Sequence, residues 1–115
     1  MKKIKKEPLF SVRCVFEHPK RENMSERHLY EERITVWRTA SFEQAIERAE
    51  REAQEYAQDR ECKYLGFAQA YYLSVEQLRS GSEVFSLMRG SNLTQTKYLD
   101  KHFDTGAERQ RNIKD

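Results

Sequence analysis

The 115-residue chain contains no run of about 18 apolar residues, which is the length that a membrane-spanning helix needs. It also has no apolar stretch of about 7 to 15 residues after its basic start, which a secretory signal would require. That start is one-sided in charge, with Lys2, Lys3, Lys5 and Lys6 ahead of Pro8. We therefore expect a cytoplasmic protein without membrane association.

Side chains that commonly carry chemistry are few and scattered. The two cysteines, Cys14 and Cys62, have no second cysteine at the close spacing of zinc sites, and the three histidines stand far apart. Neither a glycine-rich phosphate loop nor a serine elbow is present. Cys14 with His18 remains open as a metal pair, but a buried thiol and a loop histidine are the favoured interpretation. We expect no metal site, no cofactor and no catalytic residue.

The composition is charged but balanced. Charged residues make up 35% of the chain, yet the net charge is only +2, and 6 Phe, 6 Tyr and 1 Trp are present. This aromatic content argues against disorder, and the interspersed opposite charges are typical of a solvated surface and not of a nucleic-acid groove. The length allows one domain.

Four segments have the patterns of β-strands: 10–16, 30–38, 64–73 and 84–89. The third carries apolar side chains on both faces, which is typical of a strand covered on both sides. Either the rest of this chain covers both faces of the sheet, or a second protein molecule closes one of them.

Two segments have helical patterns. Ser41 and Gln44 form a capping box at the start of a helix predicted to run to about residue 58, and a shorter helix is predicted over 94–103. We therefore predict an α+β fold of ββαββα order, with a four-stranded antiparallel sheet and the main helix packed on one face. The predicted organisation is a flexible basic leader over 1–9, one domain over 10–103 and a polar tail over 104–115.

The two predicted halves hint at an internal duplication. An offset of 51 residues aligns Glu32 with Glu83 and Arg38 with Arg89, each time just before a capped helix start. The match is short, so a chance similarity stays open.

The sequence leaves two functions other than protein binding open. Glu31 and Glu32 are neighbours on a strand and point to opposite faces, so they cannot form a carboxylate dyad. One of them, with an arginine, would serve a small-molecule enzyme whose site lies over the sheet, and this is the main alternative. A sheet that binds RNA by stacking bases is a third possibility; its candidate residues are Trp37, Tyr64, Tyr72, Arg13 and Arg33.

Protein binding needs the fewest assumptions. If the helices cover one face of the sheet, Arg13, Trp37 and Tyr72 would lie on the other, and this mixture is favoured at interface hot spots. We therefore predict a non-enzymatic protein-binding module that acts through its sheet face, with a protein partner or a second copy bound. Immunity or antitoxin proteins are a subclass suggested by size. The predicted binding residues are Arg13, Glu31, Arg33, Trp37, Tyr72 and Arg109.

Several segments resemble a bacterial family known only as domain of unknown function 4288. They are 11–16 (SVRCVF), 30–35 (YEERIT), 64–71 (YLGFAQAY), 83–89 (EVFSLMR), 103–106 (FDTG) and 108–110 (ERQ). The resemblance implies one compact bacterial domain that includes the tail motif, and it brings no activity or catalytic residue with it. Arg109 of that motif is hypothesised to fold back and pair with Glu31 or Glu32.

Overall fold

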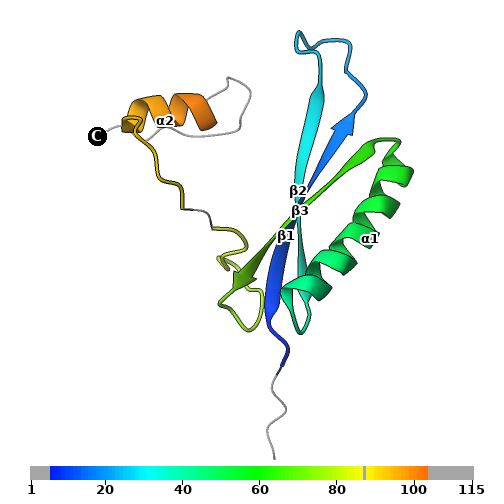
Figure 1. Cartoon of the computed structure of the whole chain (residues 1–115), viewed down its shortest axis with the longest axis vertical. Helices are drawn as coiled ribbons and strands as arrows, with labels where there is room; N and C mark the ends of the chain where they lie inside the picture. The colour runs from blue at the N-terminus through cyan, green and yellow to red at the C-terminus, as the bar shows by residue number, and fades with distance from the viewer. Residues whose placement is uncertain (1–5, 87, 104–115) are drawn as a thin grey trace, which may run out of the picture.

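The computed structural model describes residues 6–86 and 88–103, and its fold is of the α+β class, as predicted (Figure 1). The elements follow the chain as β1 (Leu9–His18), β2 (Leu29–Arg38), α1 (Phe42–Arg60), β3 (Lys63–Leu73) and α2 (Gln95–His102). The strands form one antiparallel sheet in the order β2-β1-β3.

The central strand β1 supplies most of the core. Its even-numbered side chains, Phe10, Val12, Cys14 and Phe16, are all buried, in accord with the period-two alternation of the sequence. All ten residues of β1 pair with β2, from Leu9 opposite Arg38 to His18 opposite Leu29. The register therefore places every second residue of β2 on the same face as this apolar row.

Helix α1 covers that face (Figure 1). The Ser41 hydroxyl accepts a hydrogen bond from the Gln44 amide at 3.2 Å, and the Gln44 side chain accepts one from the Ala40 amide, so the predicted capping box is confirmed with one change of partner. The helix ends at Glu61, which adopts the left-handed conformation. Its buried face consists of small side chains that allow close approach to the sheet: Ala45, Ala49, Ala53 and Ala57.

The predicted four-stranded sheet is wrong, because the sheet has three strands and the described residues of segment 84–89 belong to none. Phe85 packs edge-on against Tyr71, with ring centroids 4.8 Å apart, and the Arg13 guanidinium lies 5.1 Å from the centre of the Phe85 ring. These contacts hold the start of the segment against the face of the sheet. An apolar alternation predicts that a segment can be a strand, but hydrogen bonding to an edge decides whether it becomes one.

Strand β3 is also less covered than its sequence predicts. Between Cys14 and Phe16 the pairing shifts, so that Val15 stands opposite the three residues 65–67. Gly66 sits in this bulge with a φ of 74°, a conformation that favours glycine. Leu65 and Phe67, on either side of it, are exposed, so the double apolar character of β3 does not correspond to burial on both faces.

Helix α2 begins where the sequence predicts, with the Thr94 hydroxyl accepting a hydrogen bond from the Lys97 amide. It lies apart from the sheet and from α1 (Figure 1), and none of its residues is buried. Neither helix in the described part of the chain is long and apolar enough to cross a membrane.

Candidate functional site

The strand register separates the sheet into two faces. Phe10 lies opposite Trp37 of β2 and Tyr72 of β3, and all three belong to the face that packs against α1. Arg13 lies opposite Ile34 and Gln69, which belong to the other face. We call these the α1 face and the open face.

On the α1 face, Glu31 is held by two neighbours. Its carboxylate accepts hydrogen bonds from the Tyr56 hydroxyl at 2.9 Å and lies 2.7 Å from the Nε2 atom of His18. Burial raises the pKa of Glu31, but the hydrogen bonds with His18 and Tyr56 outweigh it and hold that pKa below its ordinary value. Both carboxylate oxygens are thus occupied by structural partners.

Next to this group, Arg33 forms a two-pronged ion pair with Glu52 of α1. The two N–O distances are 2.5 and 2.9 Å, and the Arg33 guanidinium lies 4.0 Å from the centre of the Tyr56 ring. The hydrogen bond to Glu52 raises the pKa of Arg33 further above its usual value. Glu31 and Arg33 therefore connect β2 to α1.

The two thiols show no sign of activation. Burial raises the pKa of Cys14 and of Cys62, which keeps both in the unreactive thiol form near neutral pH. The Tyr64 hydroxyl, which donates to Glu50 at 2.5 Å, also has a raised pKa, caused first by burial and then by that hydrogen bond. No group of three metal-ligating side chains occurs among residues 6–86 and 88–103.

On the open face, Arg13 is the centre of a polar network. Its guanidinium donates to Gln69 at 2.6 Å and to the Tyr71 hydroxyl at 3.4 Å, and it pairs with Glu32 at 3.3 Å. With Phe85 stacked on it, the side chain of Arg13 is only 21% exposed. Arg13 is thereby fixed in one orientation across the three strands.

The end of the open face nearest the start of β1 is covered. Leu9, Ser11 and Leu73 are buried there, and the following loop is tied down by a hydrogen bond from Arg38 to the carbonyl of Glu76. Beyond Arg13 the cover stops. We call this uncovered end the open patch, formed by Val15, Tyr30, Glu32 and Ile34 with Arg13 at its border.

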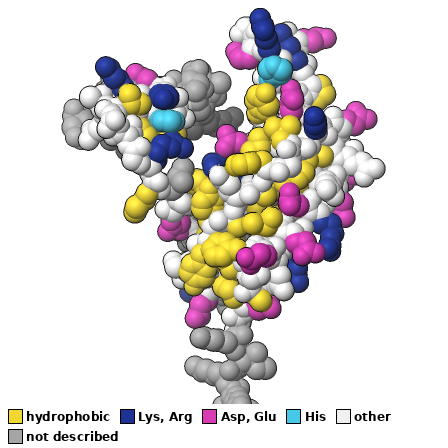
Figure 2. Space-filling model, viewed as in Figure 1, with side chains coloured by type: hydrophobic (Ala, Val, Ile, Leu, Met, Phe, Trp, Pro, Cys, Tyr) yellow, Lys and Arg dark blue, Asp and Glu magenta, His cyan; other side chains and the backbone are white. Residues whose placement is uncertain are grey.

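The open patch mixes apolar and charged side chains on two strands. Tyr30 is 56% exposed and Ile34 is 38% exposed, while Val15 is half-buried between them and the exposed side chain of Glu32 pairs with Arg13. Figure 2 shows hydrophobic side chains gathered over the strands in view, with charged side chains dispersed around and among them.

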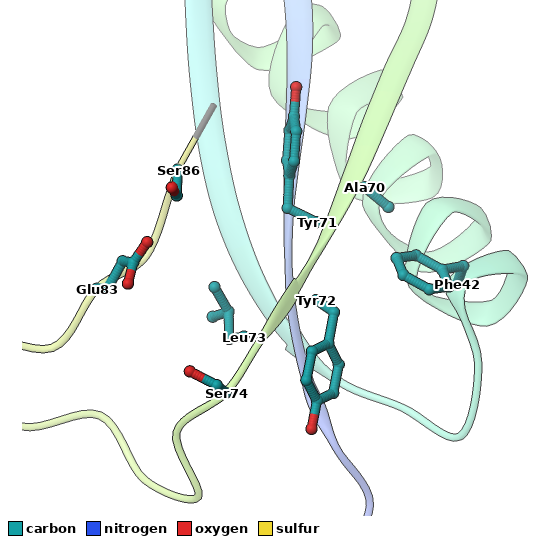
Figure 3. A pocket seen from close by; sticks show the side chains of 8 residues that line it. All are labelled: Phe42, Ala70, Tyr71, Tyr72, Leu73, Ser74, Glu83 and Ser86. Atoms are coloured by element: carbon teal, nitrogen blue, oxygen red, sulfur yellow. The ribbon is translucent and has the colours of Figure 1, made fainter. Parts of the chain in front are cut away.

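A cavity of about 290 Å³ lies at the free edge of β3, the side away from β1. Figure 3 shows β3 passing between Phe42 of α1 on one side and Glu83 and Ser86 on the other. The rest of its wall is the last part of β3 and the residue after it, 70–74. No carboxylate and arginine converge in it, so it lacks the acid–base pair that an enzyme of the alternative type would need.

The predicted binding residues do not form one surface. Glu31, Arg33, Trp37 and Tyr72 lie on the α1 face, while Arg13 lies on the open face. The expectation that Arg13, Trp37 and Tyr72 share a face was wrong, because the sequence pattern does not reveal which residues of neighbouring strands stand opposite each other. Arg109, with its hypothesised pairing, lies outside the described residues.

Sequence reasoning missed Tyr30 and Ile34 as surface residues. Their even numbering within 30–38 separates them from Glu31, Arg33 and Trp37, and that alternation was visible in the sequence. The sequence does not show that Ile34 pairs with Arg13. This pairing places the even-numbered side chains of β2, including Tyr30, on the open face.

No family model, curated protein or solved structure matches the chain. The resemblance to the family of unknown function therefore rests on the sequence segments that carry it.

Proposed function

We propose that this chain is a non-enzymatic protein-binding module whose contact surface is the open patch. The observation that supports this proposal is the exposure of Tyr30 and Ile34 on a sheet face that neither helix in the described residues covers. An antiparallel sheet tolerates water on one face when that face is polar, but here the large side chains of Tyr30 and Ile34 are exposed on it.

The chemistry of the patch favours a protein as the ligand. An exposed tyrosine and an isoleucine offer apolar contact area, and Arg13, already fixed by Gln69 and Tyr71, loses little conformational entropy on binding. Glu32 is exposed enough to form an ion pair with a basic residue of a partner. Small-molecule sites are concave, and none of the patch residues lines either of the two cavities found among the described residues.

The test is affinity capture from a lysate of the source organism, using the wild type and the Ile34→Glu variant. A partner that binds through the open patch is retained by the wild type and lost with Ile34→Glu, because a buried unpaired carboxylate is costly at an interface. Arg48→Glu is the matched control, since Arg48 is an exposed residue of α1 and its replacement changes the net charge in the same direction and by more than Ile34→Glu does.

Retention of every specific partner by Ile34→Glu would contradict the proposal. A folded Ile34→Glu variant is expected, because the side chain is exposed in the isolated chain, and circular dichroism checks this before capture.

A further inference from the structure

We infer that a second copy of this chain pairs with the free edge of β3, so that two sheets join into one across a two-fold axis. This inference concerns the side of the molecule away from β2 and is independent of the open patch.

The two edge strands of the sheet differ in how they are protected. β2 has four charged residues among ten, namely Glu31, Glu32, Arg33 and Arg38, whereas residues 64–73 of β3 contain neither a charge nor a proline. Exposed strand edges in natural proteins are usually protected by charges, proline, bulges or a covering segment, because their unpaired backbone groups accept another strand. β3 has only the bulge at Gly66, and that bulge leaves its last six residues regular.

The regular part of the edge is long enough for pairing. Residues 68–73 pair with β1 without a register shift, and six residues is the usual length of a strand. No strand occupies their other side within the described residues, and the cavity of about 290 Å³ lies there instead (Figure 3).

Large apolar side chains accompany the edge. Tyr72 is 60% exposed and Phe67 is 50% exposed, and Phe42, half-exposed at the start of α1, shares with Tyr72 a contact to Phe10. A fully buried aromatic side chain covers roughly 150–250 Å², so the exposed parts of these three rings offer roughly 230–390 Å² in each protomer. This is about a third to a half of the ~800 Å² that each partner contributes to a stable interface. Leu65 and the backbone of the edge add to it.

The edge is complementary to itself. A two-fold axis perpendicular to the sheet makes β3 antiparallel to its copy and keeps both α1 helices on the same side. Because residues of equal parity then share a face, Tyr72 lies opposite Ala68 or Ala70 of the partner subunit. A large exposed ring meets a small side chain in both directions, and no like charges oppose each other within residues 64–73 of the two strands; Glu83, in the wall of the edge cavity, lies outside this pairing. These features favour a second copy over an unrelated partner.

The test measures the molar mass of the full chain by light scattering across a dilution series, for the wild type and for Tyr72→Lys. The wild type is expected at twice the 13.8 kDa of one chain, and Tyr72→Lys at a single chain mass. Tyr30→Lys is the matched control, because Tyr30 is equally exposed on the other edge strand. It should remain a dimer and lose only the partner of the open patch, so failure of this inference and failure of the proposed function are distinguishable.

A wild type that is monomeric at every concentration would overturn the inference, as would a folded Tyr72→Lys variant that stays dimeric. Should Tyr72→Lys not fold, hydrogen exchange of the wild type decides. The probe is the set of amides in 68–73 that point away from β1, because the others donate to β1 within one chain. Protection of these outward amides that falls on dilution supports pairing with a second copy. Protection of the same amides that is independent of concentration means that the chain's own segment covers the edge, and it refutes the proposal.

Discussion

The α1 face and the open face of one small sheet differ in what completes them. On the α1 face, each charged side chain of β2 has a partner within the chain, Glu31 with His18 and Tyr56 and Arg33 with Glu52. On the open face, Arg13 is satisfied, but Tyr30 and Ile34 beyond it remain exposed. The chain is thus stabilised through its α1 face, while the open face keeps Tyr30 and Ile34 exposed.

The largest loss of stability is expected from a substitution on the α1 face, at Phe16. Its ring is fully buried beneath α1 and packs against the rings of Tyr56 and Tyr64 at centroid distances of 5.1 and 5.5 Å. Phe16→Ala should lower the free energy of unfolding by about 3–5 kcal/mol, because it removes apolar contacts and leaves a cavity. Chemical denaturation measures the change. A loss below about 1 kcal/mol would mean that this side of the core can collapse around the deletion.

A smaller effect is expected at the ion pair that joins β2 to α1. Arg33→Ala should cost about 1–2 kcal/mol, since it removes a two-pronged, half-buried pair with Glu52 and the packing over Tyr56. Arg51→Ala is the control, because the Arg51–Glu47 pair is exposed one turn apart on α1 and is worth only about 0.3–0.5 kcal/mol. If Arg33→Ala and Arg51→Ala lowered the free energy of unfolding equally, the Arg33–Glu52 pair would contribute no more than an exposed ion pair.

The contribution of Glu31 to the stability of the α1 face depends on pH. Its pKa is lowered in the folded state, so its contribution to stability is fully present above the ordinary carboxyl pKa of about 4.3 and is lost as the pH falls through the folded value. Glu31→Gln should cost roughly 1 kcal/mol near neutral pH, a modest value because a third of the side chain is exposed and screened. The difference from the wild type should shrink in acid below about pH 4. Urea denaturation at several pH values measures it, and a difference that grows in acid would reverse the assigned sign.

The smallest effect on stability is expected on the open face. Ile34→Ser should lower the free energy of unfolding by about 1 kcal/mol or less, because the residue is 38% exposed and only part of its apolar area is packed in the isolated chain. Thermal unfolding of the purified variant checks this. A loss as large as that of Arg33→Ala would indicate that part of the same molecule or a second copy covers the open patch in solution.

The local elements of this fold could be predicted from particular residues. Alternation around Val12 and Cys14 predicts β1, and the capping residues Ser41 and Thr94 mark the starts of both helices. These signals are local, since hydrogen bonds and side-chain periodicity within a few residues produce them. The α+β class follows from their order.

The candidate surfaces could not be predicted in the same way. Trp37 and Tyr72 have the composition of a binding site, but the register places them opposite Phe10 on the α1 face. Phe85 lies in a segment with the pattern of a strand, but it packs on Tyr71 and Arg13. A shift of one residue in strand pairing exchanges the two faces, and nothing within a single strand records that register.

The sequence pattern alone predicts the three strands of the sheet, the two helices, the apolar row of β1 and the absence of charge over 64–73, but it also predicts a strand over 84–89 that does not form. Only the tertiary structure decided that β1 is central, that β2 and β3 are the edges, and that Tyr30 and Ile34 share the open face with Arg13. The physical reason is that secondary structure depends on contacts between near neighbours in the chain. Faces and edges depend on pairing between residues such as Arg13 and Gln69, which are far apart in the sequence.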